Sequence, residues 1–159
     1  MTTRPGGVRR WMYRGGRPNR LARALNTLSA AQFARGVLAP ERAVTLEVRG
    51  RTTGRPVALP LVVADVSGEH YLVSMLGEAN WVRNVRAAGG IATLRHGRSR
   101  RVRLLEVPPG ERAAVLRRYL ALAPGARPHF PIGPDAPLAD FAAIADHYPV
   151  FRITDAGPA

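Results

Sequence analysis

The chain has 159 residues, of which 46% are apolar, a length and a share typical of one globular domain. It contains no cysteine, which excludes disulfides, thiolate catalysis, iron–sulfur clusters and cysteine zinc sites. The net charge of +13 comes from 24 basic residues that are all arginine, a skew that indicates a GC-rich genome more than selection for phosphate binding, so we expect no nucleic-acid partner.

The positive charge is concentrated at the start of the chain. Residues 1–40 hold eight arginines and no acidic residue, so we expect a basic N-terminal arm over 1–40 and a separate domain over 41–155. Within the arm, Leu21, Leu25 and Leu28 repeat at helical spacing. This amphipathic helix is expected either to dock on the domain or to contact a membrane surface. No apolar run reaches the ~18 residues that a membrane span needs, and we expect a cytoplasmic protein. An arginine-rich, acid-free start also fits an organelle transit peptide, although the overall composition resembles that of bacterial proteins.

The first half of the domain predicts strands and one helix. Residues 43–48 alternate between apolar and polar side chains, as in a half-buried strand. Residues 57–66 form a second apolar strand, and Pro60 within it indicates an edge, an end or a bulge. A hairpin turn at Ser67-Gly68 leads into a third strand over 71–76. A short helix over 79–88 then ends at two glycines.

The second half adds strands and two further helices. Strands are expected over 91–95, 101–107 and 150–153, with a phase shift at Leu104-Leu105 that indicates a β-bulge. The residues expected on the apolar faces of helices at 111–122 and after Pro137 are Val115, Leu116, Tyr119, Leu122, Leu138, Phe141 and Ile144. These elements predict an α+β fold with an antiparallel or mixed six-stranded barrel and peripheral helices, because no βαβ alternation is present.

The turn Gly50-Arg51-Thr52-Thr53-Gly54-Arg55-Pro56 lies between the first two predicted strands. Its two arginines, two hydroxyls and backbone amides suit a phosphate or a carboxylate. The alternative is a hairpin loop whose arginines face water, and composition alone favours that alternative.

A second candidate segment joins a strand to a helix and reads Ser74-Met75-Leu76-Gly77-Glu78-Ala79-Asn80-Trp81-Val82-Arg83-Asn84. The first amides of a helix attract anions and carbonyl oxygens. Asn80 and Asn84 lie one turn apart on one face. The alternative is a tryptophan in the core with two solvated asparagines.

Other catalytic patterns are missing from the sequence. The four histidines have no metal-ligand spacing, so we expect no metal site. No serine lies in a nucleophile elbow, and no carboxylate pair suggests hydrolysis. An enzyme of this sequence would therefore take its chemistry from a bound cofactor.

The order of the motifs G-R-T-T-G-R-P, V-A-L-P-L-V, Y-L-V-S-M-L-G and N-W-V-R-N-V resembles the deazaflavin-dependent nitroreductase family. That family typically has G-R-x-[ST]-G-[KR] in the first turn, a short strand with Pro-Leu, and a glycine turn before W-x-x-N-[LV]. The resemblance is good over about 43–107 and looser through the last strand. It implies an FMN-binding split-barrel-like fold, related to flavin reductases, that binds coenzyme F420, an 8-hydroxy-5-deazaflavin with a lactyl-phosphate and polyglutamate tail.

The resemblance also implies roles for particular residues. The phosphate and the tail would be held by Arg51, Thr52, Thr53 and Arg55. The ring system would lie beside Leu59, Pro60 and Leu61, with backbone contacts from Ser74, Met75 and Gly77, and the pocket would be closed by Asn80, Trp81 and Asn84. His129 and Tyr148 are candidate proton donors, and Phe130 and Tyr13 are candidates for the substrate side.

The implied reaction is transfer of a hydride from the reduced deazaflavin to a small-molecule acceptor, namely a quinone, a nitro compound or an activated alkene. Three alternatives remain open from the sequence. The first is a non-catalytic protein of the same fold that binds lipid or F420, and the second is a split barrel that binds FMN or haem. The third is a nucleic-acid or membrane-surface binder that depends on the basic arm. By analogy with other split barrels, we also expect a homodimer.

Overall fold

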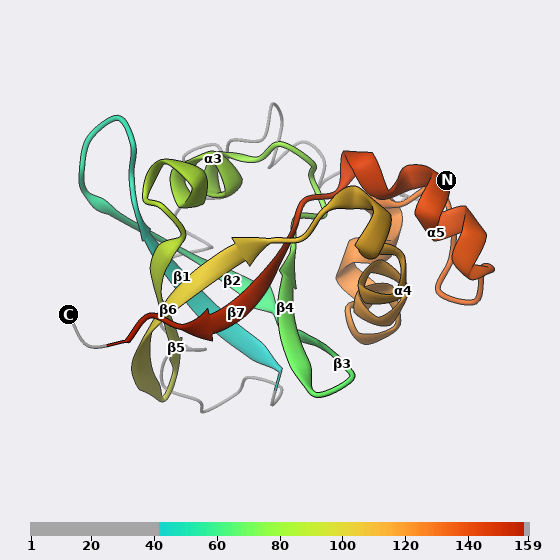
Figure 1. Cartoon of the computed structure of the whole chain (residues 1–159), viewed down its shortest axis with the longest axis horizontal. Coiled ribbons are helices and arrows are strands. Elements are labelled where there is room, and N and C mark those ends of the chain that lie inside the picture. Colours follow the sequence, from blue (N-terminus) through green and yellow to red (C-terminus); the bar gives the residue numbers. More distant parts are fainter. Residues whose placement is uncertain (1–41, 158–159) are drawn as a thin grey trace, which may run out of the picture.

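The computed structural model describes residues 42–157, and these residues form a split β-barrel with helices at its sides (Figure 1). In chain order its elements are β1 (Ala43–Arg49), β2 (Pro56–Val62), β3 (Ala64–Val66), β4 (Glu69–Val73), α3 (Asn80–Ala87), β5 (Ile91–His96), β6 (Arg98–Glu106), η2 (Pro109–Glu111), α4 (Ala113–Leu122), η3 (Pro124–His129), α5 (Leu138–Ile144), η4 (Ala145–His147) and β7 (Val150–Asp155). The strands form one curled sheet in the order β2-β1-β5-β6-β7-β4-β3, and all recorded pairs are antiparallel. The predicted basic arm, with its leucine stripe and Tyr13, lies outside the described residues.

Strand β2 lies at one edge of the sheet, which is one of the three alternatives that Pro60 indicates, because proline cannot donate a ladder hydrogen bond. The apolar run over 57–66 is divided at Val63, whose backbone amide donates to the carbonyl of Arg42 at 2.7 Å. The remainder of the run becomes β3, which pairs with β4 through a tight turn at Ser67 and Gly68. The sheet therefore has seven strands rather than the six that the sequence predicts.

The β-bulge predicted at Leu104-Leu105 is wrong. Leu104 pairs with Ile153 and Leu105 pairs with Arg152, so the register of β6 and β7 continues without interruption. Leu104 is buried and Leu105 is 38% exposed. Two adjacent leucines resemble a phase shift in the sequence, but here the second one lies on the outer face of a regular strand.

The interior contains two hydrophobic clusters. The first, which we call the barrel core, includes Leu46, Trp81, Val85 and Phe151, and it fills the curled sheet beneath α3. The second, which we call the lobe core, lies between the sheet and helices α4 and α5. Its buried residues include Val115, Leu116, Tyr119, Leu120, Phe130, Phe141 and Tyr148.

Strands β4 and β7 separate the two cores. Leu72 belongs to the barrel core and its neighbour Val73 belongs to the lobe core. Phe151 and Val150 divide in the same way, because successive residues of a strand point to opposite faces. Helix α3 and the pair α4–α5 consequently cover different sides of the sheet (Figure 1).

The region with η2, α4, η3 and α5, which we call the helical side, differs in detail from the sequence prediction. The helix expected over 111–122 begins at Ala113, after the separate turn η2, and Leu120 is buried where Leu122 is only half-buried. The region expected to be a loop contains η3. Pro137 directly precedes the first residue of α5, where Phe141 is buried and Leu138 is 42% exposed.

Candidate functional site

The two motifs that the sequence singles out lie against each other. The Oδ1 atom of Asn84 accepts hydrogen bonds from the backbone amide of Arg51 at 3.1 Å and from its Nη1 at 2.8 Å. The guanidinium of Arg51 also donates to Asn80, to Oδ1 at 3.3 Å and to the carbonyl oxygen at 3.4 Å. We call residues 50–56 the arginine turn. The structure thus joins it to α3 through contacts between residues about 30 positions apart.

The backbone of the arginine turn is closed by its own hydrogen bonds. The amide of Gly50 donates to the carbonyl of Arg55, and the amide of Gly54 donates to the carbonyl of Gly50, both at 2.8 Å. The amide of Arg55 donates to Thr53 Oγ1 at 3.2 Å. Within residues 42–157, no hydrogen bond is recorded for the amides of Thr52 and Thr53. These two amides are therefore available to an anion.

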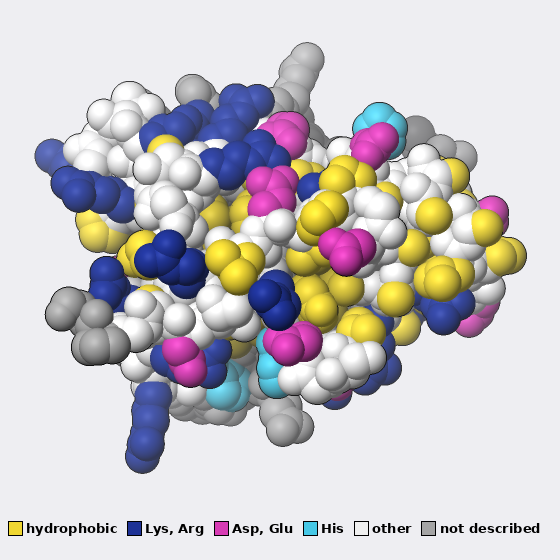
Figure 2. Space-filling view, viewed as in Figure 1, with side chains coloured by type: hydrophobic (Ala, Val, Ile, Leu, Met, Phe, Trp, Pro, Cys, Tyr) yellow, Lys and Arg dark blue, Asp and Glu magenta, His cyan; other side chains and the backbone are white. Residues whose placement is uncertain are grey.

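Three arginines belong to this turn or directly precede it. Arg49, Arg51 and Arg55 are exposed, and Arg49 lies close to Gly54. Among the described residues, no carboxylate forms an ion pair with any of the three. Figure 2 shows basic side chains over the side of the molecule that carries α3, and hydrophobic side chains over α4 and α5.

Helix α3 places its two asparagines and its tryptophan in different environments. Asn84 is only 5% exposed, so it is neither solvated nor without a partner, because its oxygen serves Arg51. Trp81 is 7% exposed and its ring lies 5.6 Å from that of Phe151 in the barrel core. Trp81 therefore packs in the barrel core and anchors α3 there, in agreement with the alternative of a core tryptophan in the sequence analysis.

The loop before α3 is held by its own polar groups. The hydroxyl of the fully buried Ser74 donates to the carbonyl of Gly77 at 2.6 Å, and the Ser74 amide donates to the carbonyl of Pro149 at 2.9 Å. Gly77 has φ +73°, and a Cβ there would lie 3.1 Å from the carbonyl oxygen of His147. A glycine is needed at this position because both the backbone conformation and the close approach disfavour a side chain. Met75 packs on the lobe core.

The apolar residues predicted to lie beside a ring system are on the edge strand. Leu59 and Leu61 are half-buried and pack on the barrel core, and Pro60 between them is also half-buried. Val57, nearer the arginine turn on the same strand, is 42% exposed. Strand β2 therefore presents a partly open apolar surface that continues from the arginine turn.

The candidate proton donors His129 and Tyr148 and the candidate substrate-side residue Phe130 lie elsewhere, at the lobe core. The rings of Phe130 and Tyr148 stack at 4.1 Å with an interplanar angle of 11°. The Tyr148 hydroxyl donates to the carbonyl oxygen of His129 at 2.8 Å. The structure thus joins these three residues to one another and places two of them, Phe130 and Tyr148, in a cluster different from the one that contains Trp81. Their roles stay predictions.

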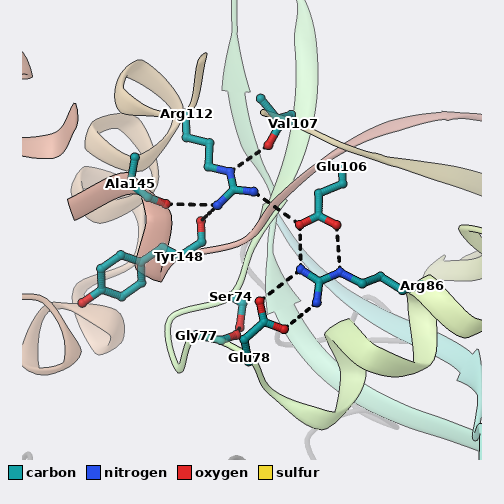
Figure 3. A network of polar contacts seen from close by, with 9 residues as sticks. All are labelled: Ser74, Gly77, Glu78, Arg86, Glu106, Val107, Arg112, Ala145 and Tyr148. Carbon is teal, nitrogen blue, oxygen red and sulfur yellow. Dashed lines mark hydrogen bonds and ion pairs between the residues drawn. The ribbon is translucent and has the colours of Figure 1, made fainter. Parts of the chain in front are cut away.

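A set of charged residues that the sequence analysis missed connects α3 with the helical side (Figure 3). It consists of Glu78, Arg86, Glu106 and Arg112, and we call it the ion chain. Arg86 donates to both oxygens of Glu106, at 2.8 and 2.7 Å, and also pairs with Glu78. The Nη2 atom of Arg112 lies 3.3 Å from Glu106 Oε2. Hydrogen bonds from Arg86 lower the pKa of Glu78 and of Glu106.

Arg112 is the buried end of the ion chain, with 5% exposure. It donates from Nε to the carbonyl of Val107 at 2.7 Å and from Nη1 to the carbonyls of Ala145 at 3.0 Å and Tyr148 at 3.4 Å. Burial lowers the pKa of Arg112. Nothing in the sequence distinguishes it from the other arginines, except its place after Pro-Pro-Gly-Glu at the start of a predicted helix.

Other features of the described surface lie apart from the arginine turn. A hollow of about 370 Å³ is lined by residues of β3 and α4, where Asp65 and Arg118 form an ion pair at 3.2 Å. Residues 42–157 contain no group of three side chains suited to hold a metal ion. None of the helices among these residues is both long and apolar enough to cross a membrane.

Comparison with known proteins identifies the fold and not the activity. No family model and no characterised protein matches the sequence. Among solved structures, the chain is similar to a domain-swapped dimer, with 15% identity and a TM-score of 0.51 over 84% of this chain and 96% of that one. It is also similar to a protein of unknown function from Agrobacterium tumefaciens, with 17% identity and a TM-score of 0.54 over 81% of this chain and 55% of that one.

A third similar structure is an F420-H2 dependent reductase, at 22% identity and a TM-score of 0.45, over 71% of this chain and 94% of that chain. Similarity at these identities concerns the fold alone. The curled antiparallel sheet with helices at its sides confirms the split barrel that the sequence predicts, while the cofactor stays a prediction.

Proposed function

We propose that this protein binds a deazaflavin coenzyme of the F420 type at the arginine turn and acts as an oxidoreductase. The observation that carries the proposal is a turn with two unbonded amides, at Thr52 and Thr53, and two exposed arginines, Arg49 and Arg55, that form no ion pair within the described residues. A phosphate and an acidic tail need such donors together. The adjacent apolar strand β2 suits a flat ring system, since ligand sites combine apolar walls with few polar groups.

We propose different tasks for the predicted cofactor residues, according to the contacts that each makes. Arg55, Thr52 and Thr53 are exposed and would bind the phosphate and tail directly. Arg51 donates to both asparagines of α3, so its part is mainly to hold the turn in place. Asn84, which is buried in α3, would help to hold the turn by accepting two hydrogen bonds from Arg51.

The remaining predicted residues would shape the space for the rings. Leu59 and Leu61 share one face of β2 and would exclude water from one side of the rings, with Pro60 between them on the opposite face of the strand. The Ser74 hydroxyl is used within its own loop, so Ser74, Met75 and Gly77 would contribute backbone groups rather than side-chain donors. When bound, the reduced coenzyme would supply a hydride to a quinone, a nitro compound or an activated alkene.

A second candidate function is binding without turnover, either of F420 or of FMN, lipid or haem. The arrangement of the lobe core favours it, because the hydroxyl of the candidate proton donor Tyr148 is already hydrogen-bonded to the carbonyl of His129. For an enzyme, the proton that completes reduction would then come from solvent. We also propose a homodimer, since one structurally similar protein is described as a domain-swapped dimer.

A binding titration tests the proposal. The full chain is titrated separately with oxidised F420, FMN and haem, and the absorbance and fluorescence of each cofactor are followed. We expect F420 to bind with a Kd of about 1–10 µM and more tightly than FMN. No F420 binding at ~100 µM protein would overturn the proposal.

Turnover separates the two candidate functions. Reduced F420 is mixed with the protein and a quinone or a nitro acceptor, and the return of the oxidised absorbance is measured. Oxidation faster than in a protein-free control supports the reductase, and binding without turnover supports the second candidate. Light scattering on the eluting protein tests the dimer.

A further inference from the structure

We propose that Arg86 is a positioning residue of the candidate site, and that through it the ion chain couples the helical side of the molecule to the arginine turn. The coupling is a property of the ligand-free chain, and only its effect on coenzyme affinity rests on the proposed function. The argument starts from helix α3, which contacts the arginine turn with one part and the ion chain with another.

Helix α3 depends on its surroundings for its position. It has eight residues, and Ala79 at its start provides no side-chain cap. A helix of this length is not stable by itself in water, so tertiary contacts must fix its orientation. Trp81, Val82 and Val85 anchor its apolar face in the barrel core. Apolar contacts restrict sliding and rotation less than directed hydrogen bonds do.

The directed contacts lie on two faces of α3. On one face Asn80, its first residue, and Asn84, one turn later, hold Arg51. On the other face, in the last turn, Arg86 hydrogen-bonds to Glu78, from the loop before the helix, and to Glu106, at the end of β6. A guanidinium that engages two carboxylates through its planar fork fixes both distance and orientation. Arg86 thereby determines how α3 presents its asparagines to the turn.

The chain of contacts continues into the helical side. Oε2 of Glu106 accepts from Arg86 at 2.7 Å and from Arg112 at 3.3 Å, so one carboxylate oxygen joins the two arginines (Figure 3). Arg112 in turn donates to the carbonyls of Ala145 and Tyr148. Since Tyr148 stacks on Phe130, a shift of the aromatic stack changes the position of a carbonyl that Arg112 holds.

The energetic consequence is reciprocal. If the arrangement of Glu106 and Arg86 changes the position of the arginine turn, then a ligand at the turn must also change the stability of the ion chain. Substitutions in the ion chain should therefore lower the affinity of the candidate site for its ligand, although no residue of the ion chain contacts that ligand. Substitution of Arg83, the exposed arginine of α3 that lies outside the ion chain, should not lower that affinity.

Hydrogen exchange in the ligand-free protein tests the coupling. The variants are Arg86→Gln and the near-isosteric Glu106→Gln, and the matched control is Arg83→Gln, an exposed residue of the same helix outside the ion chain. The readout is the amide of Arg51, which donates to Asn84, compared with the amide of Ala123, which donates to the carbonyl of Tyr119 at the end of α4. We expect exchange at Arg51 to rise about tenfold relative to Ala123 in both ion-chain variants, and to change less than about twofold in the control.

An equal rise at both amides would indicate general destabilisation and would overturn the proposal, and so would the same relative rise in Arg83→Gln. If Arg86→Gln does not fold, Arg86→Lys, which keeps the charge and loses the fork, takes its place and must show the same selective rise. The oxidised coenzyme F420 is then the probe for affinity, with an expected loss of about tenfold in Glu106→Gln. A selective rise in exchange together with no F420 binding by the wild-type chain would support the coupling and remove the proposed function.

Discussion

The barrel core and the lobe core lie back to back across β4 and β7, and they are held together by different forces. In the barrel core, inward-facing side chains of paired strands and the face of α3 bury apolar surface, and no buried ion is needed. The lobe core gathers α4, α5 and irregular turns around Phe141 and the Phe130–Tyr148 stack. Arg112 holds the carbonyls of those irregular segments.

This difference indicates how each region should respond to change. Apolar burial is non-directional and tolerates small movements. A buried guanidinium that satisfies three carbonyls is directional, and losing it leaves polar groups unpaired. The candidate site lies mainly beside the barrel core. The ion chain connects it to Arg112, whose directional hydrogen bonds hold the segments around the lobe core.

The largest expected effect comes from truncating an aromatic residue in either core. Phe151→Ala and Phe141→Ala should each lower the free energy of unfolding by about 3–5 kcal/mol, because both rings are fully buried. The two variants should differ in their effect on the surroundings of Trp81, because the Trp81 ring packs on that of Phe151. The chain has two tryptophans, so Trp11 is first replaced by Phe and Trp81 alone is observed. In this Trp11→Phe background, the tryptophan emission should shift in Phe151→Ala and stay unchanged in Phe141→Ala. An equal shift in both would mean that the cores are not separate.

The second prediction concerns Arg112 itself. Arg112→Met keeps the length of the side chain but leaves the carbonyls that it holds unpaired, and it should cost about 3 kcal/mol in urea unfolding. The control is Arg152→Met on β7, where the half-exposed arginine lies 3.9 Å from Glu69 and should contribute less than about 1 kcal/mol. Similar losses of unfolding free energy in Arg112→Met and Arg152→Met would contradict the inference that Arg112 stabilises the segments around the lobe core.

A smaller effect is expected from acid. The pKa values of Glu78 and Glu106 in the folded protein lie below their ordinary value of 4.5, so the unfolded chain binds protons more readily. The stability from these carboxylates is therefore complete above pH 4.5 and is lost as the pH falls through the lower, folded values. Because both side chains are partly exposed, the total should stay below about 1 kcal/mol.

Glu106→Gln isolates this contribution. The variant lacks the titrating carboxylate, so the difference in unfolding free energy between wild type and variant should narrow as the pH falls from about 6 to about 3. Urea unfolding at several pH values measures it. A difference that is constant over that range would show that Glu106 stabilises the protein by packing rather than by charge.

Much of the barrel was predictable because its signals are local. Alternation over Val44, Leu46 and Val48 predicts an inward face, and Pro60 restricts its strand to an edge, an end or a bulge, of which the structure has the edge. The same local reasoning fails at Leu104-Leu105, since two adjacent leucines do not reveal which one faces outward. It also cannot count strands where one apolar run is divided, as at Val63.

The candidate site was predictable only as separate pieces. The sequence identifies the arginine turn and the asparagine helix, but their contact joins residues 33 positions apart and depends on how β1 and α3 pack. The ion chain was missed for a different reason. In a chain with 24 arginines, a buried arginine has the same sequence signature as an exposed one, and only the tertiary structure separates Arg112 from the others.

The smallest expected effect on stability, and the sharpest test of the site, comes from Arg55. Its side chain is exposed and no ion pair is recorded for it among the described residues, so Arg55→Gln should change the free energy of unfolding by less than about 0.5 kcal/mol. If the guanidinium binds the anionic tail, the same substitution should weaken F420 binding about tenfold, because hydrogen bonds to charged groups contribute about 1.5–3 kcal/mol. Arg98→Gln, on the distant β5–β6 hairpin, removes the same charge from another exposed position. It should weaken F420 binding less than about twofold at physiological salt, where the field of a remote charge is screened. Equal losses in the two variants would mean that the coenzyme senses only the net charge of the protein, and the arginine turn would then have no particular part in binding.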